Sequence, residues 1–414
     1  MWSGDGRVRS QYEAYPYPAR DPRDEKKRLI TGSPSHLDEL RHHLFAGRLD
    51  PDRPFRVLVA GGGTGDGLIM LAQQCRDAGL AAEITYVDLS EASRRLAEAR
   101  AQVRGLTDMI AFRTGSLLEL DRIAPGPFDY IDCCGVLHHL DDPAAGLAAL
   151  AARLAPGGGM GLMVYGALGR TGVYPLQSAL RRLTDGLPDA ERVALAKRLL
   201  GGLPETNWFQ RNPGLGDHKA SDAGLYDLLL HSRDRAYTVP EVADLVAECG
   251  LGIVTFIDPL LYDPALLIAD PGVRGRIHGL DPLARAALAE ELSGAIKTHI
   301  FYVKRRDEAA GAQASPDDAT LKPVLRGVDA AALARTLKPG KPLAITRNGL
   351  RYVLEMPPLA GAIAARIDGE RTIGDLHRDV AATQPAGLSR DVFRRQFDAL
   401  YAGLNGFSKL FLRG

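Results

Sequence analysis

The chain has 414 residues, of which 45% are hydrophobic and 25% charged, values typical of a globular protein that buries a core. Basic and acidic residues number 51 each, so no overall basic character is present to neutralise phosphates, which argues against a nucleic acid partner. Four cysteines without a CxxC pair argue against a disulfide scaffold and a metal site, and no apolar run reaches the ~18 residues of a membrane span. Together with a polar N-terminus, these features predict a cytoplasmic protein with no membrane partner.

Residues 1–54 form a polar, proline-rich segment with an aromatic cluster at Tyr12, Tyr15 and Tyr17. From Phe55 onward, short apolar runs alternate with helical stretches of about ten residues or more. The expected strands are 56–60, 83–88, 110–115, 128–137 and 160–166, and the expected helices are 68–79, 90–105 and 143–159. This alternation predicts parallel β-α units and a sheet covered by helices on both faces.

Residues 167–236 interrupt this alternation with a helical pattern and a polar, aromatic loop. It resumes with a helix that Thr238 is expected to N-cap and in which Pro240 fits the first turn, and with strands at 251–258 and 298–305. The predicted fold class is therefore α/β, with a seven-stranded, mostly parallel, doubly wound sheet of the Rossmann type. The predicted domains are an N-terminal arm (1–54), an α/β domain (55–306) with helical insertions at 166–237 and 259–297, a linker (307–322) and a C-terminal α+β unit (323–414).

The most informative segment is VLVAGGGTGDG (57–67), in which a strand runs into a glycine cluster and a helix then opens. Gly61, Gly62, Gly63 and Gly65 permit a tight turn and a close approach to a ligand, and the helix N-terminus offers free N–H groups. On glycine spacing alone, a tight turn without a ligand remains an alternative.

Asp88 closes the second expected strand 25 residues after Gly63. A carboxylate at that position of a nucleotide-binding sheet accepts hydrogen bonds from ribose hydroxyls, and it can also cap the helix that follows. The glycine loop and the acid together leave two classes open, a dinucleotide oxidoreductase and a methyltransferase.

The motifs downstream favour the methyltransferase. In order they are Gly115-Ser116-Leu117, FDYIDCCGVLHHLDDP (128–143) and LAPGGGMGLMVYG (154–166). With the glycine loop and the VDLS around Asp88, they resemble the class I S-adenosylmethionine-dependent methyltransferases over roughly residues 55–165. More loosely, QYEAYPYP (11–18) and LYDLLLHSRDRAYTVPEV (225–242) resemble the flanking segments of a bacterial subgroup whose methyl acceptors are mostly undefined.

The resemblance implies S-adenosylmethionine as cofactor. The residues that it assigns to cofactor binding are Gly61, Gly62, Gly63, Gly65, Asp88, Leu89, Ser116, Leu117, Cys133 and His138, together with Tyr12 and Tyr17 where the arm folds over the cofactor as a lid. An aromatic anchor that pins the N-terminus to the core is the alternative for the tyrosines. The family often has an acid at the position of Val59, which orders the ammonium end of the cofactor. Here that contact has to come from water, backbone carbonyls or another residue.

Methyl transfer from a sulfonium requires alignment and desolvation, and it needs a general base only when the acceptor is protonated. The candidates for catalysis are His138, after the fourth strand, His231, four residues after Asp227 on an expected helix, and Tyr15 of the arm. His139 is interpreted as a structural histidine, and a surface pair is the alternative for Asp227 and His231.

The last ninety or so residues show strands, three short helices and a terminal strand, the order of a winged-helix unit. IDGERTIGDL (367–376) resembles the winged-helix units that grip precursor peptides in natural-product pathways, and such units can bind a peptide as an added strand. DNA binding through Arg390, Arg394 and Arg395, or homodimerisation and packing, are the alternatives.

The sequence thus predicts a methyltransferase that acts on a protein or peptide, because a small-molecule enzyme has no evident need for the extra unit. Methylation of a small molecule or natural product is the second candidate. From another class, a catalytically idle cofactor-binding or regulatory protein would account for Val59 and for Ser116, where many relatives have Asp.

Overall fold

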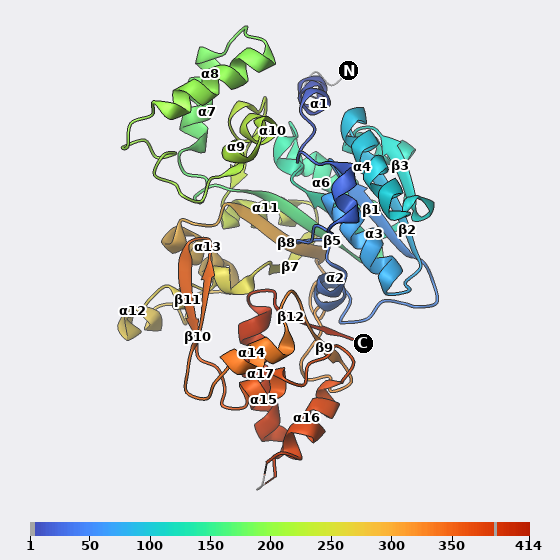
Figure 1. Cartoon of the computed structure of the whole chain (residues 1–414), viewed down its shortest axis with the longest axis vertical. Helices are drawn as coiled ribbons and strands as arrows, with labels where there is room; N and C mark the ends of the chain where they lie inside the picture. Colours follow the sequence, from blue (N-terminus) through green and yellow to red (C-terminus); the bar gives the residue numbers. More distant parts are fainter. Residues whose placement is uncertain (1–4, 385–386) are drawn as a thin grey trace.

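The central sheet has the strand order β3-β2-β1-β4-β5-β8-β7, with the short β6 paired to the end of β5 (Figure 1). A computed structural model of the protein describes residues 5–384 and 387–414. The strands are β1 (Phe55–Ala60), β2 (Ala82–Asp88), β3 (Ile110–Thr114), β4 (Phe128–Cys134), β5 (Leu154–Gly166), β6 (Ala236–Tyr237), β7 (Leu251–Phe256) and β8 (Thr298–Arg305). Only β8 runs antiparallel to its neighbours, which confirms the predicted seven-stranded, mostly parallel sheet; the two-residue β6 is an addition.

Alternate residues of the buried strands supply two separate hydrophobic cores, one on each face of the sheet. On β1, Val57 and Val59 pack with one set of helices, and Leu58 and Ala60 with the other. The first face carries α2 (Leu37–Leu44), α3 (Asp66–Asp77) and α4 (Glu91–Arg104), and the second carries α6 (Pro143–Ala151), α11 (Val239–Glu248) and α13 (Pro282–Ser293). The sheet is therefore covered on both sides, as the alternation predicted.

The predicted start of α11 is confirmed, whereas the end of α6 is not. Thr238 N-caps α11 and forms a capping box with Glu241, and Pro240 lies in the first turn. The helix expected at 143–159 ends at Ala151, because Leu154 already pairs with Phe128 and begins β5. The proline- and glycine-rich stretch that we expected at the end of the helix therefore belongs to β5, because it pairs with β4.

A helical cap with its own hydrophobic core lies at one end of the molecule (Figure 1). It consists of α7 (Val173–Leu183), α8 (Asp189–Gly201), α9 (Asp217–Ala220), α10 (Asp222–Leu225) and a π-helical turn (Tyr226–Leu230). The N-terminal helix α1 (Asp5–Ala14) leads to this cap, where Tyr15 stacks on Tyr226 with ring centroids 5.1 Å apart. A further short helix, α12 (Pro271–Gly275), belongs to the second insertion.

The C-terminal unit lies at the opposite end (Figure 1). Its elements are β9 (Lys322–Leu325), α14 (Ala330–Thr336), β10 (Leu343–Arg347), β11 (Leu350–Leu354), α15 (Ala360–Ala364), α16 (Ile373–Ala381), α17 (Arg390–Asn405) and β12 (Leu410–Arg413). β9 pairs with β12, and the β10–β11 hairpin precedes the three helices. The winged-helix assignment stays a prediction.

The C-terminal unit and the segment before it pack closely on α2. The ring of His42 bonds to the Tyr401 hydroxyl (2.9 Å) through Nε2 and accepts the Leu412 amide (3.1 Å) at Nδ1. The amide of Ala314, in the segment interpreted as a linker, donates to the His42 carbonyl (2.7 Å). The division into domains stays a prediction. Across the described ranges, no helix combines the length and apolar character needed to cross a membrane.

Candidate active site

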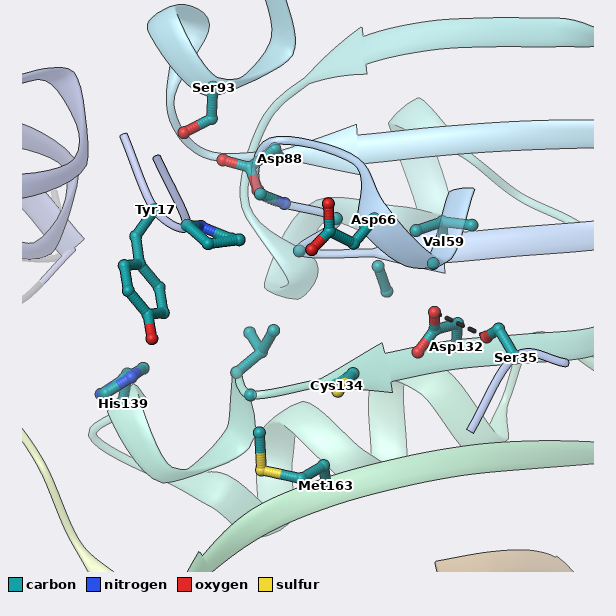
Figure 2. A pocket seen from close by; sticks show the side chains of 18 of the residues that line it. Tyr17, Ser35, Val59, Asp66, Asp88, Ser93, Asp132, Cys134, His139 and Met163 are labelled. Carbon is teal, nitrogen blue, oxygen red and sulfur yellow. Dashed lines mark hydrogen bonds between the residues drawn. The ribbon is translucent and has the colours of Figure 1, made fainter. Parts of the chain in front are cut away.

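A cavity of ≈ 470 Å³ lies at the carboxyl ends of β1, β2 and β4, where ligands bind in open α/β sheets (Figure 2). The predicted cofactor residues that line it are Gly61, Gly62, Gly63, Asp88, Leu89, Ser116, Leu117, Tyr12 and Tyr17. The cavity is thus open at the place where the sequence predicts the nucleoside.

The glycine loop forms the wall of this cavity nearest to α3. Gly61 has φ +70°, and a Cβ there would collide with the side chain of Val136. Gly65 has φ +98° and immediately precedes α3, where a Cβ would lie 3.0 Å from the methyl of Ala97. Gly65 therefore serves the packing of α3 on α4 and does not line the cavity.

Asp88 ties the glycine loop to the start of α4. Its Oδ2 accepts the Gly63 amide and its Oδ1 accepts the Ser90 amide, both at 2.8 Å. A carboxylate has about four acceptor sites, so two remain for donors from a ligand. Burial raises the pKa of Asp88 to about 6, although the two amide hydrogen bonds oppose that rise. This geometry suits the two hydroxyls of a ribose.

The arm packs on the N-terminus of α4, the helix that follows Asp88. The carboxylate of Glu13 accepts the amides of Glu91 (2.6 Å) and Ala92 (3.1 Å), and so caps the N-terminus of α4. The Ser90 hydroxyl donates to the Tyr12 carbonyl (3.2 Å). Helix α1 is thereby fixed over the helix that follows Asp88.

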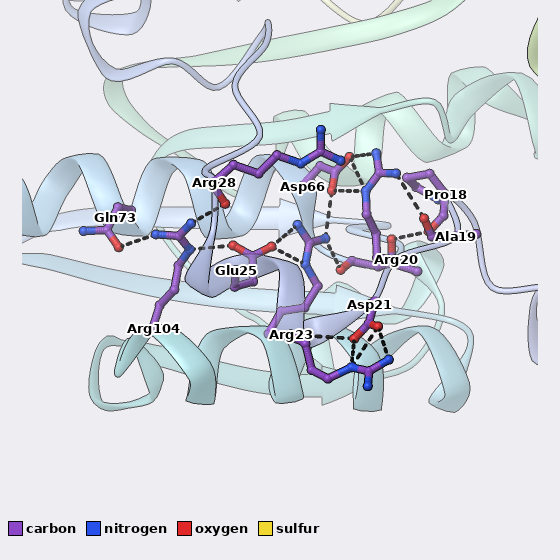
Figure 3. A network of polar contacts seen from close by, with 12 residues as sticks. Pro18, Ala19, Arg20, Asp21, Arg23, Glu25, Arg28, Asp66, Gln73 and Arg104 are labelled. Carbon is purple, nitrogen blue, oxygen red and sulfur yellow. Dashed lines mark hydrogen bonds and ion pairs between the residues drawn. The ribbon is translucent and has the colours of Figure 1, made fainter. Parts of the chain in front are cut away.

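The next part of the arm is held by a network of buried charges (Figure 3). Arg100 of α4 forms ion pairs with Glu25 (2.7 Å) and with Asp66 (2.8 Å). Asp66 also accepts a hydrogen bond from the Arg20 guanidinium. Arg104 adds a second contact to Glu25 (2.5 Å). Only 1% of the Arg100 side chain and 3% of that of Glu25 are exposed, so the arm is joined to α3 and α4 through the protein interior.

Several predicted site residues lie elsewhere. Cys133 belongs to the core on the far face of the sheet, and its neighbour Cys134 lines the cavity instead. His138 is buried against Tyr165, with ring centroids 4.0 Å apart, and does not line the cavity; Tyr15 packs on the cap. His139, interpreted from sequence as structural, is the histidine of this pair that lines the cavity.

The end of the cavity beyond the glycine loop is an aromatic and acidic cluster, which we call the acceptor end. Tyr12, His139, Tyr165 and Asp227 line the cavity there, and His231 completes the cluster by packing on His139. Oδ1 of Asp227 accepts the Tyr12 hydroxyl (3.0 Å), and Oδ2 accepts the Tyr165 hydroxyl (2.9 Å). The rings of His139 and His231 stack, with centroids 3.8 Å apart. His231 lines a second cavity of ≈ 230 Å³.

Backbone contacts fix which nitrogen of each imidazole carries the proton. Nδ1 of His139 lies 2.8 Å from the Arg233 carbonyl, which can only accept, so Nε2 of the neutral ring has a free lone pair. Nδ1 of His231 accepts the Arg233 amide (3.0 Å), so its Nε2 carries the hydrogen and lies 3.3 Å from the Tyr12 hydroxyl. Burial lowers the pKa of His231, which favours this neutral form.

His139, Asp227 and His231 also bring one ligand atom each within 4.8 Å of one another. His231 could offer Nε2 to a metal only by giving up the hydrogen bond from the Arg233 amide, and both oxygens of Asp227 already accept hydroxyls. The cluster therefore fits a hydrogen-bonding network better than a metal centre.

Sequence reasoning did not single out several residues that line the cavity. They are Ser35, Asp66, Asp132, Met163 and Tyr165. The available signal was Asp132, a carboxylate between the apolar Ile131 and Cys133 of β4, since such residues are seldom buried without a role. Ser35 carried no comparable signal.

Comparisons with known proteins agree with this geometry. A family described as "Methyltransferase domain" matches residues 58–160. Uncharacterized protein syc1184_c from Synechococcus sp. is 31% identical over 310 residues, which cover 72% of this chain and 71% of that protein. Ubiquinone biosynthesis O-methyltransferase from Bordetella bronchiseptica is 33% identical over 138 residues, but these cover only 33% of this chain and 52% of that protein.

Among solved structures, PKMT2 from Rickettsia typhi is similar over 97% of this chain and 75% of its own, with a TM-score of 0.59 and 14% identity. Its complex with AdoHcy gives a TM-score of 0.62 over 92% of this chain and 77% of its own, at 13% identity. At such identity the likeness concerns the fold. Together with the sequence matches and the motifs, it defines the class: the chain belongs to the class I S-adenosylmethionine-dependent methyltransferases, and S-adenosylmethionine is its cofactor.

Proposed function

We propose that this enzyme methylates a side chain of a protein or peptide, with His139 as the general base. The observation that carries the proposal is the size and position of the cavity. At ≈ 470 Å³ it suits one ligand of drug size, which the cofactor represents. An acceptor must then reach the methyl group from the acceptor end with only a slender group, as a side chain of a larger molecule does.

The second cavity supports an extended acceptor. It lies between α1, α7, α8 and the π-helical turn, and His231 of the acceptor end is one of its lining residues. Arg7, Arg181, Arg192 and Asp185 are among its lining residues. We expect residues next to the methylated side chain to bind there, which gives the cap a role in acceptor recognition.

When bound, S-adenosylmethionine supplies a methyl group on a sulfonium, which is a good leaving group. The chain's contribution is to align the acceptor, exclude water and remove a proton. His139 lines the cavity, and Nε2 of its neutral ring has a free lone pair that takes that proton from an amine or hydroxyl. The Arg233 carbonyl holds the ring in this tautomer, and Asp227, Tyr12 and Tyr165 position the surrounding wall.

A small-molecule acceptor is the second candidate. It is favoured by the ubiquinone biosynthesis O-methyltransferases, which are 24–33% identical to this chain. These proteins match about a third of the chain, so the match leaves most of the chain uncovered.

Transfer of a tritiated methyl group separates the two candidates. The full chain is incubated with [methyl-³H]S-adenosylmethionine and an extract of the cells that encode it, and the products are separated by size before and after protease treatment. We expect label in large, protease-sensitive material, and His139→Gln as the matched control should remove it. Label confined to small organic-soluble products would overturn the protein or peptide acceptor.

A further inference from the structure

Four carboxylates line the cofactor cavity, and in three of them both oxygens already have partners. Asp66 pairs with Arg20 and Arg100. Asp227 accepts two tyrosine hydroxyls, and Asp88 accepts two backbone amides in the arrangement that suits a ribose. The fourth is Asp132 of β4, which lies across the cavity from Asp66 (Figure 2).

The carboxylate of Asp132 is buried and half satisfied. Only 4% of the residue is exposed, and Oδ2 accepts the Ser35 hydroxyl at 2.7 Å. The Tyr130 hydroxyl lies 3.0 Å from the Ser35 oxygen and 3.4 Å from the Pro34 carbonyl, to which it can donate. Oδ1 has no hydrogen-bonding partner, and no Lys, Arg or His of residues 5–384 and 387–414 forms an ion pair with Asp132.

An isolated buried carboxylate is costly, and burial raises the pKa of Asp132 to about 6. A cation that donates hydrogen bonds to Oδ1 would offset that cost. The neighbouring backbone is shaped for a close approach, because a Cβ on Gly67 would lie only 2.6 Å from Oδ2. The first turn of α3 can therefore run directly beside the carboxylate.

The register of the sheet places Asp132 next to Val59. Val59 of β1 and Asp132 of β4 are partners in the parallel ladder, so their side chains leave the same face of the sheet side by side. Val59 is the position at which the resembling family often has an acid for the ammonium end of the cofactor. In this chain the acid, Asp132, is therefore on the neighbouring strand β4 instead of on β1.

We propose that Asp132 binds the α-ammonium group of the methionine part of S-adenosylmethionine. Asp132, on β4, would thus do what an acid on β1 does in many members of the family. The inference rests on cofactor binding in this cavity but not on the nature of the acceptor. Ser35 is a positioning residue in this arrangement, since its hydroxyl fixes Oδ2 and leaves Oδ1 directed to the ligand.

Calorimetry with two ligands tests this assignment on the full chain. AdoHcy has the α-ammonium group, whereas 5′-methylthioadenosine has the same nucleoside and lacks the amino acid part. Asp132→Asn keeps the size of the side chain and removes its charge. It should weaken AdoHcy binding about ten- to a hundredfold, as expected for a hydrogen bond to a charged group. Binding of 5′-methylthioadenosine should change less than twofold, which also reports that the nucleoside site is intact.

A positional exchange gives the second test. Asp132→Val should lose AdoHcy affinity, and adding Val59→Asp should recover most of it, because the two side chains are ladder partners. An equal loss for both ligands in Asp132→Asn, no loss for either, or no recovery in the double variant would overturn the proposal. Failure of the wild-type chain to bind AdoHcy would overturn cofactor binding in this cavity as well.

Discussion

The nucleoside end of the cavity is built from residues close together in the chain, whereas the acceptor end is assembled from distant ones. The glycine loop, Asp88 and Leu117 follow each other on consecutive β-α units, and backbone amides hold them in place. Tyr12, His139 and Asp227 come from the arm, the sheet edge and the cap, and they are held by contacts between side chains and by the Arg233 carbonyl. A site of the first kind can be recognised in a sequence, and one of the second kind emerges only in three dimensions.

The largest effect is expected where the acceptor end meets the methyl group. His139→Gln keeps a polar side chain of similar size but cannot take a proton, so the rate of methyl incorporation should fall about 10²- to 10⁴-fold. AdoHcy affinity, measured by calorimetry, should stay within twofold of wild type. His218→Gln, in the cap but outside both cavities, is the control and should keep the wild-type rate. A fully active His139→Gln would remove the base from the mechanism.

The support of the nucleoside end is tested by Arg100→Met. The change leaves the buried carboxylate of Glu25 and that of Asp66 without a shared cation, so the free energy of unfolding should fall by about 3–5 kcal/mol. Urea denaturation measures this loss. Arg95→Met on the same helix removes only an exposed pair with Glu91 and should change stability by about 0.5 kcal/mol or less. Equal effects of the two variants would mean that the buried network does not anchor the arm.

A smaller effect is expected for the ribose contact. Asp88→Ala should weaken AdoHcy binding by about 1.5–3 kcal/mol, because hydrogen bonds to a charged group are lost. The amide of Gly63 also loses its acceptor, so the loop is less well ordered. Calorimetry checks the value, with Glu83→Ala, an exposed acid at the other end of β2, as the control. An unchanged affinity in Asp88→Ala would place the nucleoside elsewhere.

The smallest expected effect is the pH dependence of nucleoside binding. Burial raises the pKa of Asp88 to about 6, and the ionised form is the one that accepts ribose hydroxyls. Affinity for 5′-methylthioadenosine should therefore fall as the pH drops through 6, by about fourfold between pH 7.5 and 5.5. Asp88→Asn should flatten this profile. The same profile in the variant would assign the titration to another group.

The ionisation of Asp88 affects the stability of the ligand-free protein in the opposite direction: stability falls as the pH rises. The folded-state pKa of Asp88 lies above its unfolded value, so its contribution to stability is fully present below the unfolded pKa of about 4. That contribution is lost as the pH rises through about 6. Thermal unfolding of the ligand-free chain should therefore show a smaller loss of stability between pH 4 and 6 for Asp88→Asn than for wild type.

Much of the fold could be predicted because its signals are local. Strand and helix periods, the cap at Thr238 and the glycine cluster each lie within a few residues. The error at the end of α6 arose where local preference and strand pairing disagree, since the ladder with β4 extends β5 back to Leu154. Pairing between distant strands is not encoded in a short window.

The sequence by itself determined the sheet, the cofactor and the acid that lies beside the glycine loop, because all of these follow from spacing along consecutive β-α units. Only the tertiary structure decided between the adjacent residues His138 and His139, of which His139 lines the cavity, since the choice depends on which way each side chain leaves the turn. It also paired Asp132 with Val59, because hydrogen-bond register joins residues that are more than seventy positions apart in the chain.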